Sequence, residues 1–86
     1  MFNRDEILYN SRSIISVWSE NEKDIDNVLI EANFGKETQK FDFGKSYEDC
    51  AIKMTDLLTT NNGCKSISIF VKHGTNTKKL GTIDIE

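Results

Sequence analysis

The chain has 86 residues, of which 37% are hydrophobic and 29% charged, and its formal net charge at pH 7 is −3. This length predicts a single domain, residues 1–86, because it leaves no room for a second core. The composition excludes a disordered tail, and no apolar stretch approaches the ~18 residues that cross a bilayer. The first six residues also lack the layout of a secretory signal, so we expect a cytoplasmic protein without a membrane partner.

Charge is distributed unevenly along the chain. Residues 1–49 carry eleven acidic and six basic side chains, a net charge of −5, whereas residues 50–86 carry three acidic and five basic ones, a net charge of +2. Direct binding to nucleic acid requires a basic stripe, and the concentrated charge here is acidic. We therefore expect no direct nucleic-acid ligand, and a basic protein surface as the partner.

The N-terminal segment predicts a helix followed by a strand. Asn3 and Glu6 form a capping-box pattern, which predicts a short helix over residues 4–10. Residues 12–19 are rich in β-branched and aromatic side chains, which favour a strand. These side chains are Ile14, Ile15, Val17 and Trp18. The polar residues 20–27 would then connect this strand to the next one as a hairpin.

Two more strands are expected before the middle of the chain. Residues 28–34 alternate between apolar and other side chains, as a half-buried strand does. Residues 35–38 form a short turn, after which residues 39–43 return with Phe41 and Phe43 on one face. Together they predict a hairpin.

The clearest pattern predicts a helix over residues 47–60. Ser46 is a favourable N-cap, and Asp49 at the third helical position completes a capping pattern. Apolar side chains recur at 3.6-residue spacing and form one stripe. They are Tyr47, Cys50, Ala51, Met54, Leu57 and Leu58.

Two closing strands are predicted at residues 65–73 and 79–85. The order is then α-β-β-β-α-β-β, which predicts a two-layer α+β fold. Its single antiparallel five-stranded sheet would have one face covered by the main helix. A β-grasp-like arrangement, hairpin then helix then hairpin, is the alternative.

Four acidic residues at two-residue spacing are the most distinctive feature of the sequence. They are Glu20, Glu22, Asp24 and Asp26. In an extended segment, side chains two residues apart share a face at ~6.7 Å per repeat, a pitch that resembles the phosphates of a nucleic-acid strand. Such a ladder of carboxylates would fit a partner's basic groove. The alternative is a solvated acidic turn.

Two aromatic residues are candidate anchors of the same interface. Trp18 directly precedes the acidic residues, and Phe70 lies among serines on the outer face of its predicted strand. Core packing is the alternative for both, and Glu31 would extend the acidic surface. The predicted partner-binding residues are therefore Trp18, Glu20, Glu22, Asp24, Asp26, Glu31 and Phe70.

No motif for catalysis or cofactor binding is complete. Gly44-Lys45-Ser46 lacks the second glycine of a phosphate-binding loop, because position 39 is glutamine. Cys50, Cys64 and His73 lack the close cysteine pairs of structural zinc sites. We therefore expect no enzymatic activity, no cofactor and no metal.

The leading hypothesis is a small acidic, non-enzymatic inhibitor or adaptor that binds another protein. Its specific form is a nucleic-acid mimic, such as a phage-encoded inhibitor of a host nucleic-acid-binding defence protein. Anti-CRISPR proteins are often small, acidic and free of motifs in this way. A toxin-neutralising immunity protein would present the same charge. The other alternative is an assembly module that homo-oligomerises through sheet edges, so a monomer and a homodimer both stay open.

Overall fold

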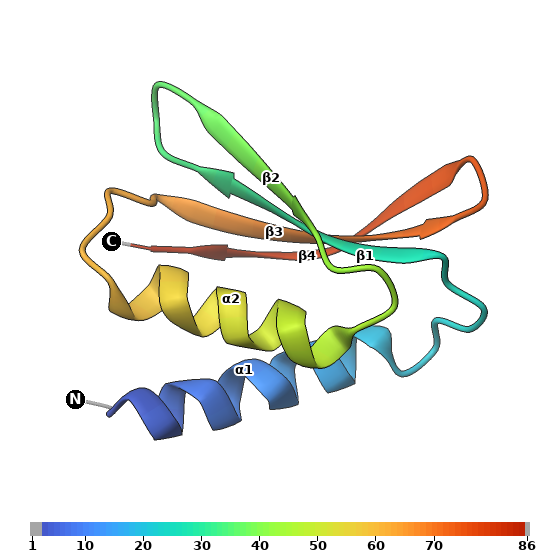
Figure 1. The fold of residues 1–86 in the computed structure, drawn as a ribbon, viewed down its shortest axis with the longest axis horizontal. Helices are drawn as coiled ribbons and strands as arrows, with labels where there is room; N and C mark the ends of the chain where they lie inside the picture. The colour runs from blue at the N-terminus through green and yellow to red at the C-terminus, as the bar shows by residue number, and fades with distance from the viewer. Residues whose placement is uncertain (1–2, 86) are drawn as a thin grey trace.

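The computed structural model of the protein describes residues 3–85, which form two helices and a four-stranded antiparallel sheet (Figure 1). The elements are α1 (Arg4–Ser19), β1 (Asn27–Asn33), β2 (Thr38–Asp42), α2 (Tyr47–Thr59), β3 (Ser66–His73) and β4 (Asn76–Asp84). Figure 1 shows the two helices side by side beneath one face of the sheet. The predicted α+β class is confirmed. Residues 1, 2 and 86 of the predicted domain lie outside the described residues.

The sheet has the strand order β2-β1-β3-β4, and every neighbouring pair is antiparallel. The prediction of five strands in the order α-β-β-β-α-β-β is wrong, since the described chain has four strands and two helices. After α1, the chain forms a hairpin, a helix and a second hairpin, which is the segment order of the alternative. The two hairpins meet in the middle of the sheet, where Ile30 of β1 pairs with Ile69 of β3.

The largest correction concerns α1, a 16-residue helix that replaces both the predicted short helix and the predicted strand over residues 12–19. Its N-cap is the expected one, because Asn3 Oδ1 accepts a hydrogen bond of 2.8 Å from the Glu6 amide. Ser11 and Ile15 are buried at a four-residue spacing, as on the inner face of a helix. β-branched side chains lower helix propensity only slightly, so packing against the core decides the conformation.

The second helix begins where the sequence predicts. Ser46 Oγ accepts a hydrogen bond of 3.1 Å from the Asp49 amide and caps α2. The helix ends at Thr59, one residue before the predicted end. The capping pattern therefore predicted the start of this helix, which the apolar stripe alone does not define.

The hydrophobic core lies between the two helices and the covered face of the sheet. Alternate residues of the two central strands are fully buried, as the predicted two-residue pattern requires. The strands contribute Val28, Ile30, Ala32, Ile67, Ile69 and Val71, and α2 contributes Cys50, Ala51, Met54 and Leu57. Packing on these side chains places α2 under β1.

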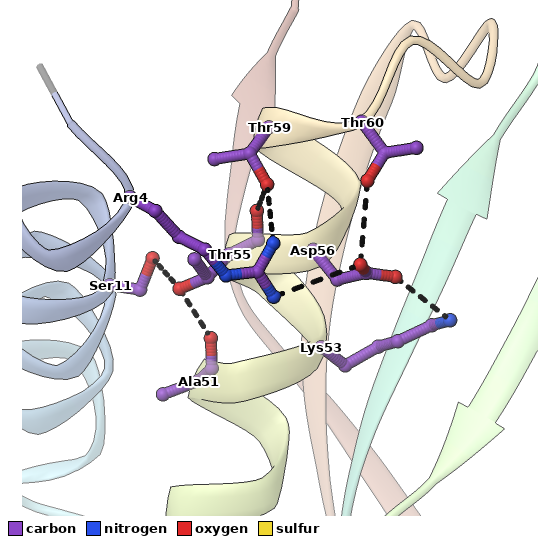
Figure 2. Close-up of polar contacts among 8 residues, drawn as sticks. All are labelled: Arg4, Ser11, Ala51, Lys53, Thr55, Asp56, Thr59 and Thr60. Carbon is purple, nitrogen blue, oxygen red and sulfur yellow. Dashed lines mark hydrogen bonds and ion pairs between the residues drawn. The ribbon is translucent and has the colours of Figure 1, made fainter.

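Polar side chains join the two helices along their contact (Figure 2). Thr55 Oγ1 lies 3.2 Å from Ser11 Oγ and 2.9 Å from the Ala51 carbonyl oxygen, and both hydroxyl groups are buried. Since a hydroxyl group has one proton, Thr55 satisfies both contacts by donating to Ala51 and accepting from Ser11. Nearer the end of α2, Arg4 Nη2 approaches Asp56 Oδ1 at 4.0 Å.

The contact between α1 and β4 depends on a glycine. A Cβ atom at Gly81 would lie 2.7 Å from Trp18 Cζ2, well inside ordinary contact distance. The Trp18 ring therefore packs directly on the β4 backbone and joins the helices to an edge strand. The register between β3 and β4 shifts close to this point, between Ile69 and Phe70.

Candidate protein-binding surfaces

The four predicted ladder residues do not lie in an extended segment. Glu20 is the C-cap of α1 with helical backbone angles, φ −60° and ψ −28°. Asp24 has a left-handed φ of 55°, and residues 20–26 contain no strand. The predicted hairpin connection is also wrong, because the segment joins a helix to a strand. Without extended backbone, the two-residue spacing does not place the four side chains on one face.

The Glu22 carboxylate makes its contacts within the molecule. Its side chain is only 7% exposed, and its carboxylate accepts from Lys78 Nζ at 2.7 Å and contacts His73 Nε2 at 3.2 Å. These contacts, and that with Lys78 above all, lower the pKa of Glu22 below its ordinary value of 4.5. Glu22 therefore ties the loop after α1 to β3 and β4 and is withdrawn from the surface.

The other three acidic residues of the segment differ in their surroundings. The Asp26 carboxylate accepts a hydrogen bond from the Gly74 amide, at the turn between β3 and β4. Glu20 and Asp24 are exposed, and neither makes an ion pair among residues 3–85. The role of these residues in partner binding stays a prediction, now centred on Glu20 and Asp24.

The two aromatic candidates occupy different sites. Trp18 is half-buried and packs on the core and on Gly81. These surroundings agree with core packing, the alternative to an exposed anchor. Phe70 lies on the face of the sheet opposite the helices, as its predicted outward orientation requires. Glu31 is on the same face in β1, so the structure brings Phe70 and Glu31 together and separates both from Trp18.

The charge separates between the two layers of the fold. The helix layer, defined as α1, α2 and the loop residues 20–26, carries nine acidic and four basic side chains over residues 3–26 and 47–59, a net charge of −5. The sheet layer, residues 27–46 and 60–85, carries four acidic and seven basic ones, a net charge of +3. The acidic excess therefore lies on the helix layer and the basic excess on the sheet layer.

The helix layer also exposes large apolar side chains. Tyr9 is 69% exposed and Val17 63% exposed on α1, and Ile52 of α2 is 43% exposed. Tyr9 and Glu20 are eleven residues apart, close to three helical turns, so they lie on one line along the outer side of α1. Sequence reasoning missed Tyr9 and Val17 because it divided α1 into a helix and a strand.

The open face of the sheet, the one without helices in the described chain, has an apolar centre. Leu29 of β1 and Phe70 of β3 are direct cross-strand partners there. They line a shallow groove of about 260 Å³. Its remaining lining residues include Glu31, Lys40, Lys72 and Thr77.

The two thiols and the imidazole group make separate contacts within the described residues. Cys50 is buried in the core, which raises its pKa to about 12. Burial also raises the pKa of Cys64, while His73 contacts Glu22. Within residues 3–85, no group of three or more metal-ligating side chains is placed to hold a metal ion.

Neither helix of the described chain has the length and apolar character needed to cross a membrane. Comparison with known proteins finds no family model, no curated protein and no solved structure that matches this chain.

Proposed function

We propose that the protein is a small non-enzymatic inhibitor or adaptor that binds a basic protein surface through its helix layer. The observation that carries this proposal is the net charge of −5 on the helix layer, combined with the exposed Tyr9 and Val17 on the outer side of α1. Large apolar or aromatic anchors surrounded by a polar rim are the usual composition of a protein interface.

The two kinds of side chain have separate roles in this proposal. Asp5, Glu20, Asp24 and Asp49 are exposed, and none of them makes an ion pair among residues 3–85, so their charge is available to a partner. Complementary charge steers the encounter and raises the association rate. Tyr9 supplies most of the affinity, because a buried tyrosine contributes large contact area at little cost in conformational entropy.

The acidic charge favours a partner with a basic groove, such as a nucleic-acid-binding protein. The specific form of the proposal is therefore a nucleic-acid mimic. The acidic surface it uses is the outer side of α1 with Glu20 and Asp24, in place of an extended ladder. A non-enzymatic role is supported by the buried Cys50 thiol and by the contact of His73 with Glu22. An immunity protein that blocks a basic toxin would use the same surface.

A pull-down from nuclease-treated bacterial lysate tests the proposal, with captured proteins identified by mass spectrometry and then purified for direct binding measurements. The test variant carries Tyr9→Ser, Glu20→Gln and Asp24→Asn. The matched control, Glu31→Gln with Glu37→Gln, removes two negative charges from the sheet layer instead.

We expect a basic protein that wild type and control both bind, and that binds the test variant at least tenfold more weakly. We also expect its affinity to fall as salt rises, because exposed charges are screened. Equal binding of that protein to wild type, the control and the test variant would contradict the assignment to the helix layer.

A further inference from the structure

We infer that the open face of the sheet is a homodimer interface, on which a second copy of the chain stacks face to face. The two-fold axis of this dimer runs parallel to the strands, between β1 and β3. The inference goes beyond the proposed function, because it concerns the opposite layer of the molecule and a different partner.

One row of side chains across the open face carries the argument. The strand registers pair Asp42 with Leu29, Leu29 with Phe70, and Phe70 with Lys79. The row therefore runs from an acidic side chain at one edge, over two apolar side chains, to a basic side chain at the other edge. A row of this kind is complementary in charge to the same row running in the opposite direction.

A two-fold axis parallel to the strands produces that reversal. It places β1 over β3 of the second copy, so Leu29 meets Phe70 of the second copy and the reverse contact forms at the same time. It also places β2 over β4 of the second copy, so Asp42 meets Lys79 of the second copy. The apolar centres of both copies are therefore buried. The charged side chain at each end of the row also gains a partner of opposite charge in the other copy.

The second possible direction of the axis, across the strands, is disfavoured. If Leu29 and Phe70 are to be covered, that axis stacks their row on the same row of the second copy, so Asp42 meets Asp42 and Lys79 meets Lys79. Like charges brought together in an interface are strongly unfavourable. Charge complementarity therefore selects one relative orientation of the two copies.

The neighbouring row is compatible with the same axis. It consists of Lys40, Glu31, Ser68 and Thr82, in strand order. The axis places Glu31 over Ser68 of the second copy and Lys40 over Thr82 of the second copy, so no like charges meet. Ser68 and Thr82 already share a hydrogen bond of 3.0 Å, and their hydroxyl groups keep further acceptor capacity for Lys40.

Pairing through sheet edges, the form of self-association expected from the sequence, is less favourable. The edge strand β4 has a shifted register next to Phe70 and carries consecutive lysines, Lys78 and Lys79. Bulges and lysines are features that protect an edge from pairing. The other edge strand, β2, has only five residues. The open face of the sheet therefore offers a better contact than either edge strand.

The size of the open face indicates a weak dimer. Four strands at ~4.8 Å spacing and about seven residues at ~3.3 Å rise cover roughly 450 Å² per copy, or about 900 Å² for the pair. Interfaces below about 1,200 Å² are typical of transient complexes. We therefore expect a weak, transient dimer with a dissociation constant in the micromolar range.

Sedimentation equilibrium from 5 to 500 μM tests the inference on the full chain. Wild type is compared with Phe70→Thr, which removes one of the two apolar side chains of the centre, and with Lys79→Glu, which places a negative charge opposite Asp42 of the second copy. We expect at least tenfold weaker association for both variants. Lys36→Glu, in the turn between β1 and β2, makes the same charge change away from the rows and should associate as wild type does.

The charge swap Asp42→Lys with Lys79→Glu tests the orientation. These two residues lie at opposite edges of the sheet, so only a contact between copies can restore association in the swap. Circular dichroism first confirms that each variant is folded, because Asp42 also accepts hydrogen bonds from Asn27 and Gly44.

Recovery of the dimer in the folded swap variant supports the inference, and its absence overturns the proposed axis. A wild type that is monomeric throughout, or a dimer that persists in Phe70→Thr and Lys79→Glu, overturns the interface itself. These results leave the proposed function separately testable, because Tyr9, Glu20 and Asp24 lie in the helix layer.

Discussion

The helix layer and the sheet layer differ in how their surfaces are organised. The helix layer is strongly acidic, and its exposed apolar side chains, such as Tyr9 and Val17, stand apart from one another on α1. The open face of the sheet is mixed in charge, with Leu29 and Phe70 side by side at its centre. The first arrangement suits a partner of opposite charge, and the second suits a copy of itself.

The attachment of the two layers is therefore central to both proposals. Most of it is apolar packing in the core, but two contacts outside the centre also hold it: Trp18 on Gly81, and Glu22 with Lys78 and His73. The following three substitutions weaken or test the helix layer and its attachment, beginning with the largest expected effect.

Gly81→Val is expected to separate the layers most strongly. Its side chain would occupy the space of the Trp18 ring, where even a Cβ atom lies 2.7 Å from Cζ2. Overpacking of this kind costs about 3 kcal/mol. Urea denaturation measures the loss as a lower midpoint with little change in slope.

A second substitution controls for the cause of this loss. Trp18→Leu in the Gly81→Val background removes the clash, so the double variant should be more stable than the sum of the two single effects predicts. Simple additivity would contradict the proposed contact between Trp18 and Gly81.

Thr55→Val is expected to loosen the helix layer itself by about 1–2 kcal/mol, because it leaves the buried Ser11 hydroxyl without its partner. Ser11→Ala added to this variant should recover most of the loss, since a matched pair of apolar groups leaves no polar atom unsatisfied. Thermal unfolding of the two single variants and the double variant measures this coupling. A double variant less stable than Thr55→Val would show that Ser11 contributes by other contacts.

Glu22→Gln has the smallest expected effect, visible mainly in the dependence of stability on pH. The pKa of Glu22 is lower in the folded protein than its ordinary value of 4.5. Its contacts therefore stabilise the fold fully above pH 4.5, and this contribution is lost as the pH falls through the folded-state pKa. The variant should lack this part of the acid sensitivity.

The lowered pKa of Asp42, held mainly by the Gly44 amide, gives a second acid-sensitive contribution that the Glu22→Gln variant should retain. Urea denaturation at intervals from pH 7 to 3 compares the two proteins. Identical profiles would contradict the role of Glu22.

Local patterns predicted the parts of the fold that local forces determine. The Ser46 cap located α2, and alternation located β1 and β3, because their covered faces are buried along their length. The β-branched residues of α1 favoured a strand locally, and only the packing of Ile15 and Trp18 on distant strands favours the helix. Nothing in the sequence of residues 12–19 indicates this packing.

The candidate surfaces were less predictable for a similar reason. Glu22 is withdrawn from the surface by His73 and Lys78, which are more than fifty residues away along the chain. The two-residue spacing of the acidic segment gave no sign of this long-range contact, nor of the left-handed backbone at Asp24. The outward orientation of Phe70 was predicted correctly because its strand alternates regularly, while its role in binding stays a prediction.

The contact of Trp18 with Gly81 also has a consequence for the order of folding. It joins an N-terminal helix to the last strand, so a long loop must close before it forms, and such non-local contacts are expected late. Trp18 is the only tryptophan of the chain. Its fluorescence should therefore report the final docking of α1, separately from the earlier formation of the two hairpins.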